Sequence, residues 1–358
     1  TSNLGLGTGA VDAITTGDYN VGVGDSALTA VTSGANNVAV GYATLTANTT
    51  GANNTASGYQ ALYYNTTGAN NTASGYQSLY SNTTGGNNTA MGGYRTLYSN
   101  TTGNFNTATG MYALRLNTTG SSNTASGYQA LYTNTTGFDN VAAGMTTLTS
   151  NTTGFYNTAV GNSSLSNNTT GSYNTATGLN SMSANTTGSQ NTAIGYSAGD
   201  NITTGSSNII IGSQVDAPSA TASNQLNIGN IIYGDMATGA LQYGNAHGVE
   251  HFYANGWVGG ATAFNVDVPI DNDASYATYF KIEAAFSHYS SYSAALEAWS
   301  VSRSTSAITT DEQFRRDTTP GGSWSVSRTS STNLRLTKTG GTSSGSGPWW
   351  VRVTFRRV

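Results

Sequence analysis

One short unit repeats from about Gly17 to Gly212 and constrains the fold more than any other feature of the sequence. A complete unit covers residues 51–67 and reads GANNTASGYQALYYNTT. A strict period of this kind predicts a solenoid, in which every unit forms one coil and stacks on the next. The first glycine of the unit recurs at a constant spacing, with one step longer by a single residue, at Gly17, Gly34, Gly51, Gly68, Gly85, Gly103, Gly120, Gly137, Gly154, Gly171, Gly188 and Gly205.

The columns of the unit predict a strand and an interior for each coil. Residues 54–58 alternate as a short strand does, so we expect Ala56 to point inward while Thr55 and Ser57 point outward. A column of leucines follows and is also expected inside. Frequent glycine opposes a helix. The columns that we expect to be structural are represented by Asn54, Ala56, Gly58, Leu62 and Gly68.

Three further local predictions complete the coil. Residues 61–63 are expected to form a second short strand. Residues 65–68 are expected to form a turn, in which Asn65 and Gly68 tolerate the left-handed backbone that a tight corner needs. The one longer step of the repeat coincides with the pair Gly92 and Gly93, which predicts a bulge of one residue.

Charge and cysteine content exclude several classes of protein. Only 8% of the residues are charged, against roughly 25% in an ordinary globular protein, but the strict repeat argues against disorder. The net charge is −4, and only Arg95 and Arg115 of the 12 basic residues precede residue 280. The repeats therefore offer no basic face for a nucleic acid. The chain has no cysteine, which excludes disulfides and thiolate metal sites, and no apolar run long enough to predict membrane insertion.

The outward column that follows the alanine indicates how the solenoid assembles. This column is more apolar at the two ends of the array, at Val23, Val40, Ile194 and Ile211, than in the middle, where Ser57 is typical. Outward apolar side chains need cover, most simply from a neighbouring chain. Because one thin coil buries little apolar surface, the sequence predicts a homotrimer.

The Asn-Thr-Thr segment that closes most units has three interpretations. The first is a turn with a ladder of asparagine side chains that bond from coil to coil. The second is N-glycosylation, because each segment is an Asn-x-Thr acceptor, and the third is ice binding by regular threonine rows. The asparagines concerned are Asn48, Asn65, Asn82, Asn100, Asn117, Asn134, Asn151, Asn168 and Asn185.

The tyrosines of the repeats have two interpretations. Side chains such as Tyr59, Tyr63, Tyr76 and Tyr80 could form a face on which carbohydrate stacks. Alternatively, they shield the edges of the coils or pack against a partner chain.

After residue 212 the period ends and a different pattern begins. Residues 213–245 are expected to cap the solenoid, and residues 246–358 to form a separate domain of short strands. Residues 264–270 carry apolar side chains at every second position and are one such strand. The predicted fold is all-β: a parallel β-solenoid stalk over residues 1–212 with about twelve coils, a capping segment, and a C-terminal β-sandwich.

No catalytic constellation stands out, and we expect neither enzyme activity nor a cofactor nor a bound metal. Three weaker alternatives concern the C-terminal domain: a metal on a trimer axis, a calcium site, and a pair of glycosidase carboxylates. None of them has the spacing of a known motif. The residues are, in that order, His247 and His251; Asp267, Asp271 and Asp273; and Glu297 and Asp311.

Two motifs resemble those of known fibrous proteins. The element Asn-[Thr/Val]-Ala-x-Gly, as in residues 54–58, resembles the head repeats of trimeric autotransporter adhesins, which form left-handed parallel β-rolls in a trimer. Longer units with Asn-Thr-Thr-Gly look like repeats of bacteriophage tail fibres. Residues 225–235, QLNIGNIIYGD, are similar to a segment that often follows such repeats in those fibres. The resemblance covers about residues 17–240, and we expect the chain to end in a β domain and not in a membrane anchor.

The resemblance implies a structural fibre of a phage tail. Such a homotrimer belongs to the virion tail, outside the cell, and contacts other tail or baseplate proteins. Its C-terminal domain binds a host cell-surface glycan or protein during adsorption, and three copies of a weak site give avidity. The alternative is a bacterial surface adhesin or an extracellular matrix filament protein at the cell surface. The aromatic candidates for receptor contact are Trp257, Trp349 and Trp350.

Overall fold

The computed structural model describes the backbone of residues 2–243 and of nine strands between Val249 and Arg357, and it describes side chains for residues 2–239. The chain divides into two compact units, Thr1–Asn224 and Gln225–Val358. This division lies inside the segment 213–245, which the sequence predicts to cap the solenoid. Every regular element in the described residues is a β-strand, and none is a helix.

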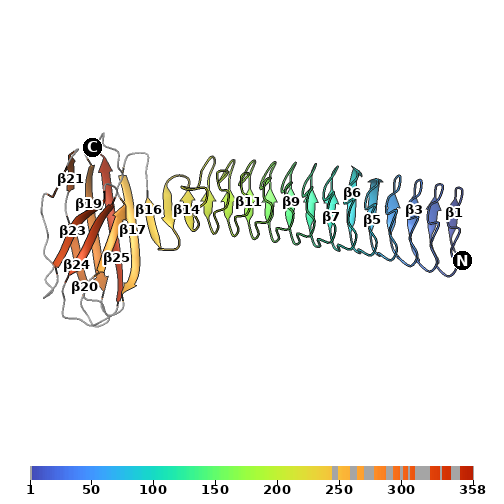
Figure 1. The fold of residues 1–358 in the computed structure, drawn as a ribbon, viewed down its shortest axis with the longest axis horizontal. Helices are drawn as coiled ribbons and strands as arrows, with labels where there is room; N and C mark the ends of the chain where they lie inside the picture. The colour runs from blue at the N-terminus through green and yellow to red at the C-terminus, as the bar shows by residue number, and fades with distance from the viewer. Residues whose placement is uncertain are drawn as a thin grey trace. The chain divides into compact units, whose positions relative to one another are not determined.

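The first unit is a parallel β-solenoid with one coil for each repeat, as the sequence predicts (Figure 1). Each coil contributes one strand, which pairs in parallel with the strand one repeat further along. Thr55 thus lies beside Thr72, and Ala56 beside Ala73. The strands are β1 (Leu4–Leu6), β2 (Val21–Val23), β3 (Val38–Val40), β4 (Thr55–Ser57), β5 (Thr72–Tyr76), β6 (Thr89–Tyr94), β7 (Thr107–Thr109), β8 (Thr124–Ser126), β9 (Val141–Ala143), β10 (Thr158–Val160), β11 (Thr175–Thr177), β12 (Thr192–Ile194) and β13 (Ile209–Ile211).

The bulge predicted at the longer step of the repeat is confirmed. Where β5 pairs with β6, Ser74 lies opposite Met91 and Gly75 lies opposite Gly93, so Gly92 is the extra residue. Gly93 has a φ of 81°, a left-handed conformation that glycine adopts at no steric cost. The two strands at the bulge have 5 and 6 residues, whereas β4 has 3. The extra residue is therefore absorbed locally, and the next coil returns to register.

The prediction of a second short strand over residues 61–63 is wrong. Gln60 and Leu62 have left-handed φ angles of 53° and 50°, and this interrupts an extended backbone. The amides still bond to the next coil, because Leu62 N donates to Ser78 O and Tyr64 N donates to Tyr80 O, both at 3.0 Å. A leucine in this conformation costs about 1–2 kcal/mol. Complete burial of the Leu62 side chain offsets that cost.

The prediction of a left-handed backbone at Asn65 and Gly68 is also wrong. In this coil the left-handed residues are Asn53, Gly58, Gln60 and Leu62. Gly68 is needed for space instead, because a Cβ there would collide with the carbonyl oxygen of Gly85 and with the side-chain oxygen of Asn65. Glycine is therefore required in this turn because the coils stack closely, and not because the backbone has an unusual φ.

The interior of the solenoid combines apolar and amide columns. Ala56 and Leu62 are fully buried, as predicted, and so is Asn54. The Asn54 side-chain amide donates to Gly68 O at 2.9 Å, while its backbone N–H donates to Asn37 Oδ1 at 3.0 Å. Buried amides are stable when they are bonded in this way. The coil is thus held by an apolar half and by a hydrogen-bonded half.

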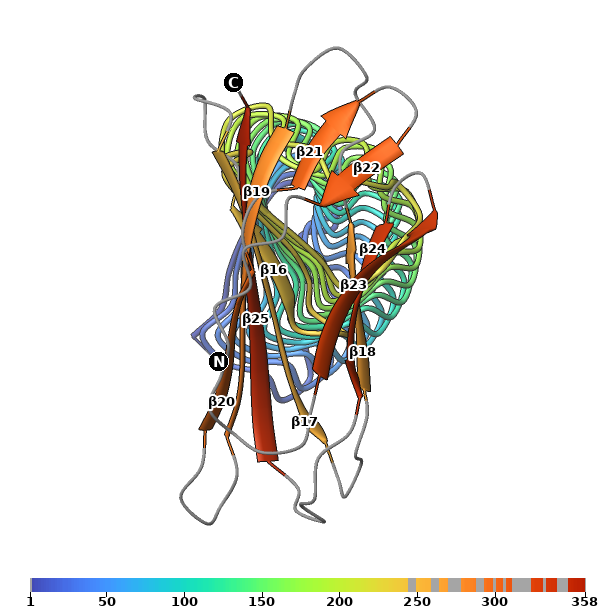
Figure 2. The ribbon, with the colours of Figure 1, turned by 90° about the vertical axis from the view of Figure 1, so that its left-hand side faces the viewer.

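The second unit is built from antiparallel strands. One sheet runs in the order β14 (Gln225–Ile228), β15 (Ile232–Asp235), β16 (Ala240–Tyr243), β17 (Val249–Val258), β25 (Gly347–Arg357), β19 (Thr278–Ser287) and β20 (Ser293–Ala298). Figure 2 shows the long strands β17, β25 and β19 side by side. The remaining strands are β18 (Phe264–Pro269), β24 (Asn333–Thr339) and β23 (Ser323–Ser330) in one sheet, and β21 (Val301–Ser304) with β22 (Ala307–Thr310) in another.

Strand β18 matches the strand expected over residues 264–270. The predicted β-sandwich depends on how side chains pack between sheets, and those side chains lie outside the described residues.

Candidate functional site

The asparagine ladder is confirmed, and it excludes N-glycosylation of the folded coils. The Asn65 side-chain amide donates to Asn48 Oδ1 at 2.8 Å and to Gly68 O at 2.9 Å. The same pattern continues to Asn185, and each of these side chains is fully buried. A glycan would be attached to this amide nitrogen, which the neighbouring coils enclose.

Threonine rows are present, but on the strand face they are interrupted. Thr124 is the last of five consecutive outward threonines that begin at Thr55, and Val141 follows it in the same column. In the Asn-Thr-Thr turn the first threonine uses its hydroxyl internally, since Thr66 Oγ1 donates to Thr83 O at 3.0 Å. The ice-binding alternative stays a prediction.

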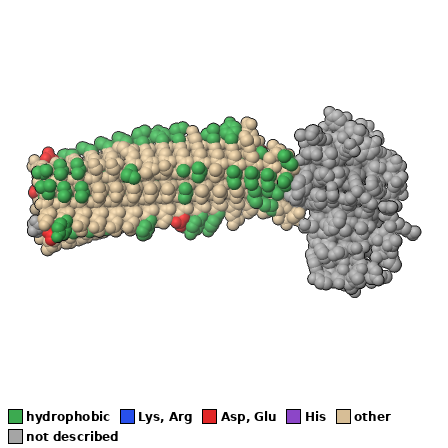
Figure 3. All heavy atoms as spheres, turned by 180° about the vertical axis from the view of Figure 1, so that it is seen from behind, with side chains coloured by type: hydrophobic (Ala, Val, Ile, Leu, Met, Phe, Trp, Pro, Cys, Tyr) green, Lys and Arg blue, Asp and Glu red, His purple; other side chains and the backbone are tan. Residues whose placement is uncertain are grey.

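The outward positions of the strands form an exposed row with apolar side chains among its members. In this row Val40 is 42% exposed, Met91 45% and Ile194 43%. Figure 3 shows, on one face of the solenoid, apolar side chains that lie in rows along its axis and gather toward its two ends. The outward direction predicted for this column is confirmed. The single chain therefore presents apolar side chains along its length.

Tyrosines form stacked ladders that continue from coil to coil. Tyr42, Tyr59, Tyr76 and Tyr94 occupy one column, and successive ring centroids lie 5.3, 5.1 and 5.0 Å apart with nearly parallel planes. Within such a ladder both faces of a ring contact neighbouring rings, and only the edges and hydroxyls face solvent. A sugar therefore cannot stack on the faces of the inner rings, as the carbohydrate-stacking alternative requires.

A second tyrosine ladder runs parallel to the first. Tyr63, Tyr80 and Tyr98 stack at 5.4 and 5.1 Å. Burial among these rings, together with a hydrogen bond to Tyr64, raises the pKa of Tyr80 to about 12. Its hydroxyl therefore stays protonated and neutral over the physiological pH range.

Arg95 lies between the two ladders. Its guanidinium carbon lies 5.2 Å from the ring centroids of both Tyr94 and Tyr98. Its Nε donates to Gln77 Oε1 at 2.9 Å, and Gln77 in turn donates to Gln60 Oε1 at 2.9 Å. Cation–π contact and this amide row therefore hold the guanidinium in one orientation.

Arg115 takes the place of a tyrosine in the second ladder, one coil further along. Its guanidinium carbon lies 5.2 Å from the ring centroid of Tyr112 and 5.5 Å from that of Tyr132, and its Nη1 donates to the Tyr132 hydroxyl. Both arginines are half-buried. The arginine–tyrosine face, as we name this set, consists of Arg95, Arg115, Tyr94, Tyr98, Tyr112 and Tyr132.

Sequence reasoning noted the two arginines but did not assign them to a site. The available signal was their isolation, since they are the only basic residues of the repeats and lie in consecutive units. Their contact with tyrosines required knowledge of which columns lie side by side.

Two carboxyl groups meet near the end of the first unit. Burial, followed by a hydrogen bond and repulsion from the Asp200 carboxyl, raises the pKa of Asp216 above its ordinary value. Two acidic groups in contact make a pH-sensitive pair. No group of three or more His, Cys, Asp or Glu side chains suited to a metal ion occurs within the described part of the chain.

The tryptophans predicted for receptor contact lie on neighbouring strands. Trp257 belongs to β17, and Trp349 and Trp350 belong to β25, with Trp257 opposite Pro348 and Trp349 opposite Gly256. The backbone thus brings the three positions close together. Their side chains lie outside the described residues.

The other side chains considered in the C-terminal domain also lie outside the described residues. They are His247, His251, Asp267, Asp271, Asp273, Glu297 and Asp311.

Comparison with known proteins gives no relative for this chain. A scan against protein-family models, a search of curated proteins and a search of solved structures each returned no match. Among the described residues, no helix has the length and hydrophobicity that crossing a bilayer requires. We therefore infer the function of the chain from its sequence and its own geometry.

Proposed function

We propose that the chain is a structural fibre of a phage tail, in which the solenoid is the stalk and the C-terminal unit binds the host receptor. The observation that carries this proposal is the uninterrupted stack of coils in Thr1–Asn224, each bonded to its neighbours through strands and side-chain ladders. Such a stack resists bending, and it has a fixed rise of about 4.8 Å per coil. A spacer that holds a binding domain away from a particle needs both properties.

The exposed apolar row on the strands supports a homotrimer. Side chains such as Val40, Met91 and Ile194 are more than a third exposed in the single chain. Three copies that pack these rows together remove them from water, and this adds stability in proportion to the apolar area buried. A trimer also carries three copies of the C-terminal unit, so weak single sites combine into tight attachment.

The receptor on this proposal is a glycan or protein of the host cell surface. Trp257, Trp349 and Trp350 are the proposed contacts, because large amphipathic rings supply much of the energy in such interfaces. Of these three positions, Trp257 and Trp350 fall on one face in the register of the paired strands β17 and β25, whereas Trp349, as the neighbour of Trp350, falls on the other face. One shared contact surface therefore includes at most Trp257 and Trp350.

Adsorption to cells and localisation on particles test this function. Fluorescently labelled full-length chain should bind some bacterial strains saturably, and antibodies against the chain should label phage tails in electron micrographs. A Trp350→Ala variant with unchanged solution mass should lose that cell binding. Labelling of a bacterial envelope in place of virions would favour the adhesin or matrix-filament alternative, and the absence of saturable binding to any strain would contradict receptor binding.

A further inference from the structure

We propose that the arginine–tyrosine face of the solenoid binds an acidic glycan that runs along the solenoid axis. This site lies on the stalk itself and does not depend on the receptor role proposed for the C-terminal unit. Charge, geometry and periodicity of the described residues support it independently.

The first support is uncompensated charge. Arg95 and Arg115 are the only arginine or lysine residues before Lys281. Within the described residues, their contacts are with tyrosines and Gln77 and not with a carboxylate. Two guanidinium groups on consecutive coils of an almost uncharged rod therefore form a local positive centre. A carboxylate or sulfate is the natural partner for such a pair.

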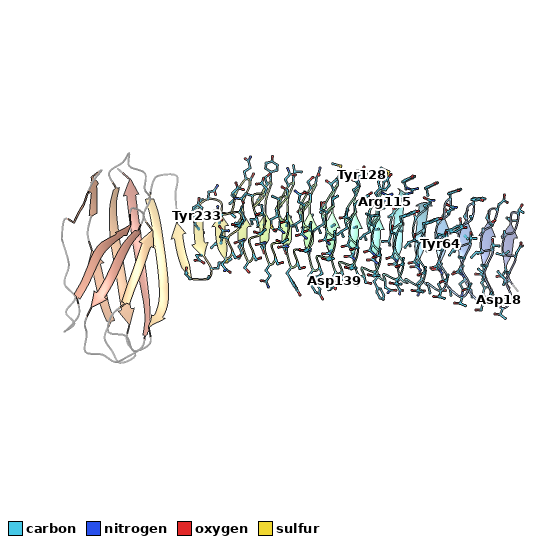
Figure 4. The ribbon with its side chains drawn as sticks, viewed as in Figure 1. Asp18, Tyr64, Arg115, Tyr128, Asp139 and Tyr233 are labelled. Carbon is cyan, nitrogen blue, oxygen red and sulfur yellow. The ribbon has the colours of Figure 1, made fainter. Side chains whose placement is uncertain are left out.

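No acidic residue occurs between Asp25 and Asp139, so the coils that carry Arg95 and Arg115 contain no carboxylate side chain. Figure 4 shows Arg115 and Tyr128 at one edge of the solenoid, and Asp139 and Asp18 at the opposite edge. An anionic ligand that approaches the arginine edge therefore meets the two cations without passing the carboxylates of the other edge.

The second support is the bulge. The parallel strands of the array have one register shift, at Gly92 in the pairing of β5 with β6, and Arg95 follows it closely in the chain. A Cβ at Gly93 would meet no atom within 4 Å, so the backbone at the bulge is open to its surroundings. Bulges are over-represented next to active sites. Arg95 follows the bulge in the ordinary register of its column, because its amide donates to Tyr76 O at 2.8 Å as the Gln77 amide donates to Tyr59 O at 2.9 Å.

The guanidinium groups retain donors for a ligand. Arg95 uses Nε for Gln77, and its two Nη groups make no hydrogen bond to the described residues. Arg115 uses Nη1 for Tyr132, and its Nη2 makes no hydrogen bond to the described residues; its Nε is buried and is not accessible to a ligand. The cation–π contacts fix both groups before a ligand arrives, so binding loses little side-chain entropy.

Periodicity indicates that the ligand is a glycan. Tyrosines recur once per coil from Tyr42 to Tyr94 and from Tyr63 to Tyr98, and their stacked rings lie 5.0 to 5.4 Å apart. This spacing is close to the length of one sugar ring in an extended chain, so each sugar can bond to one coil. A nucleic acid needs many more phosphate contacts and free aromatic faces for its bases, and this surface supplies neither.

An array of carboxylated, sulfated and neutral oligosaccharides, probed with the full-length chain, tests the proposal. We expect binding to acidic glycans only, at least tenfold weaker affinity in an Arg95→Gln, Arg115→Gln double variant, and weakening as salt rises. Asp139→Asn, which changes one charge at the opposite edge, is the control and should retain binding. Thermal unfolding of each variant checks that the solenoid is intact.

Three results would overturn this assignment. They are the absence of acidic-glycan binding on the array, equal binding by the double arginine variant, and equal binding of oligoglutamate. The last result would show that the face recognises negative charge without recognising sugar.

Discussion

The two units of the chain obtain their strand pairing in opposite ways. In Thr1–Asn224 each strand pairs in parallel with the strand one repeat further along, as Ala56 does with Ala73. In Gln225–Val358 the pairs are antiparallel, and some join distant residues such as Val249 and Arg356. The repeat therefore determines register locally, whereas the second unit must close long loops before its contacts form.

This comparison predicts that the first unit tolerates changes in length only in whole repeats. Deletion of residues 120–136 joins Thr119 to Gly137 and leaves every column in phase, so cooperative unfolding and the circular dichroism spectrum should persist. Deletion of residues 120–127 shifts the columns and should abolish stacking of the following coils. Removal of a segment as long as one repeat from the second unit, 249–265, takes out β17 and should unfold that unit.

Equal tolerance of the two solenoid deletions, measured by chemical denaturation, would show that register does not depend on the repeat. Loss of folding in the whole-repeat deletion would likewise show that register does not depend on the repeat.

The next largest effect is expected at the glycines where coils approach most closely. Gly58 has a φ of 134°, and a Cβ there would lie 2.5 Å from Gly75 O. Gly58→Ala should lower the free energy of unfolding by more than about 3 kcal/mol, since both φ and space are unfavourable. Gly93→Ala is the control, because its Cβ meets no atom and only its left-handed φ costs about 1 kcal/mol. Similar losses in both variants would show that close stacking of coils is not the constraint.

The asparagine ladder should contribute somewhat less per residue. Asn117→Ala removes the amide that donates to Asn100 Oδ1 and Gly120 O, and it leaves the Asn134 amide with only Gly137 O of its two acceptors. We expect a loss of about 2–4 kcal/mol in equilibrium denaturation. Thr119→Ala, at an exposed position of the same turn, should change stability by less than about 0.5 kcal/mol. An Asn117→Ala variant with the same free energy of unfolding as the native chain would show that the ladder does not hold the coils.

The smallest predicted effect is a pH dependence at the end of the solenoid. Burial and the Asp200 contact raise the pKa of Asp216 above 3.8, so the folded state holds this proton more tightly than the unfolded state. The associated stability is fully present below the ordinary pKa and is lost as the pH rises through the raised pKa. Asp216→Asn should therefore be more stable than the native chain at pH 7, and this advantage should shrink on acidification. An advantage that is constant with pH would contradict the carboxyl pairing.

The sequence predicts the first unit well because each column occurs many times. The inward Ala56 and Leu62, the asparagine ladder and the bulge at Gly92 follow from period and side-chain chemistry. The second strand at 61–63 was a wrong prediction, because nothing local indicates that a leucine adopts a left-handed backbone. That conformation is stabilised by burial between coils, which is a tertiary effect.

The candidate site was harder to predict than the fold. Arg95 and Arg115 are conspicuous by composition, but their contacts depend on the alignment of two columns that are separate in sequence. In the second unit no column repeats, so alternation indicates strands such as β18 without indicating that β24 is its partner.

Solution mass tests the proposed fibre most directly. Light scattering of the full-length chain should give three times 36.8 kDa, because the exposed apolar rows need partner chains to cover them. A monomer of 36.8 kDa at micromolar concentration would contradict the trimeric fibre. The solenoid would then be a single-chain rod whose exposed rows require a different partner.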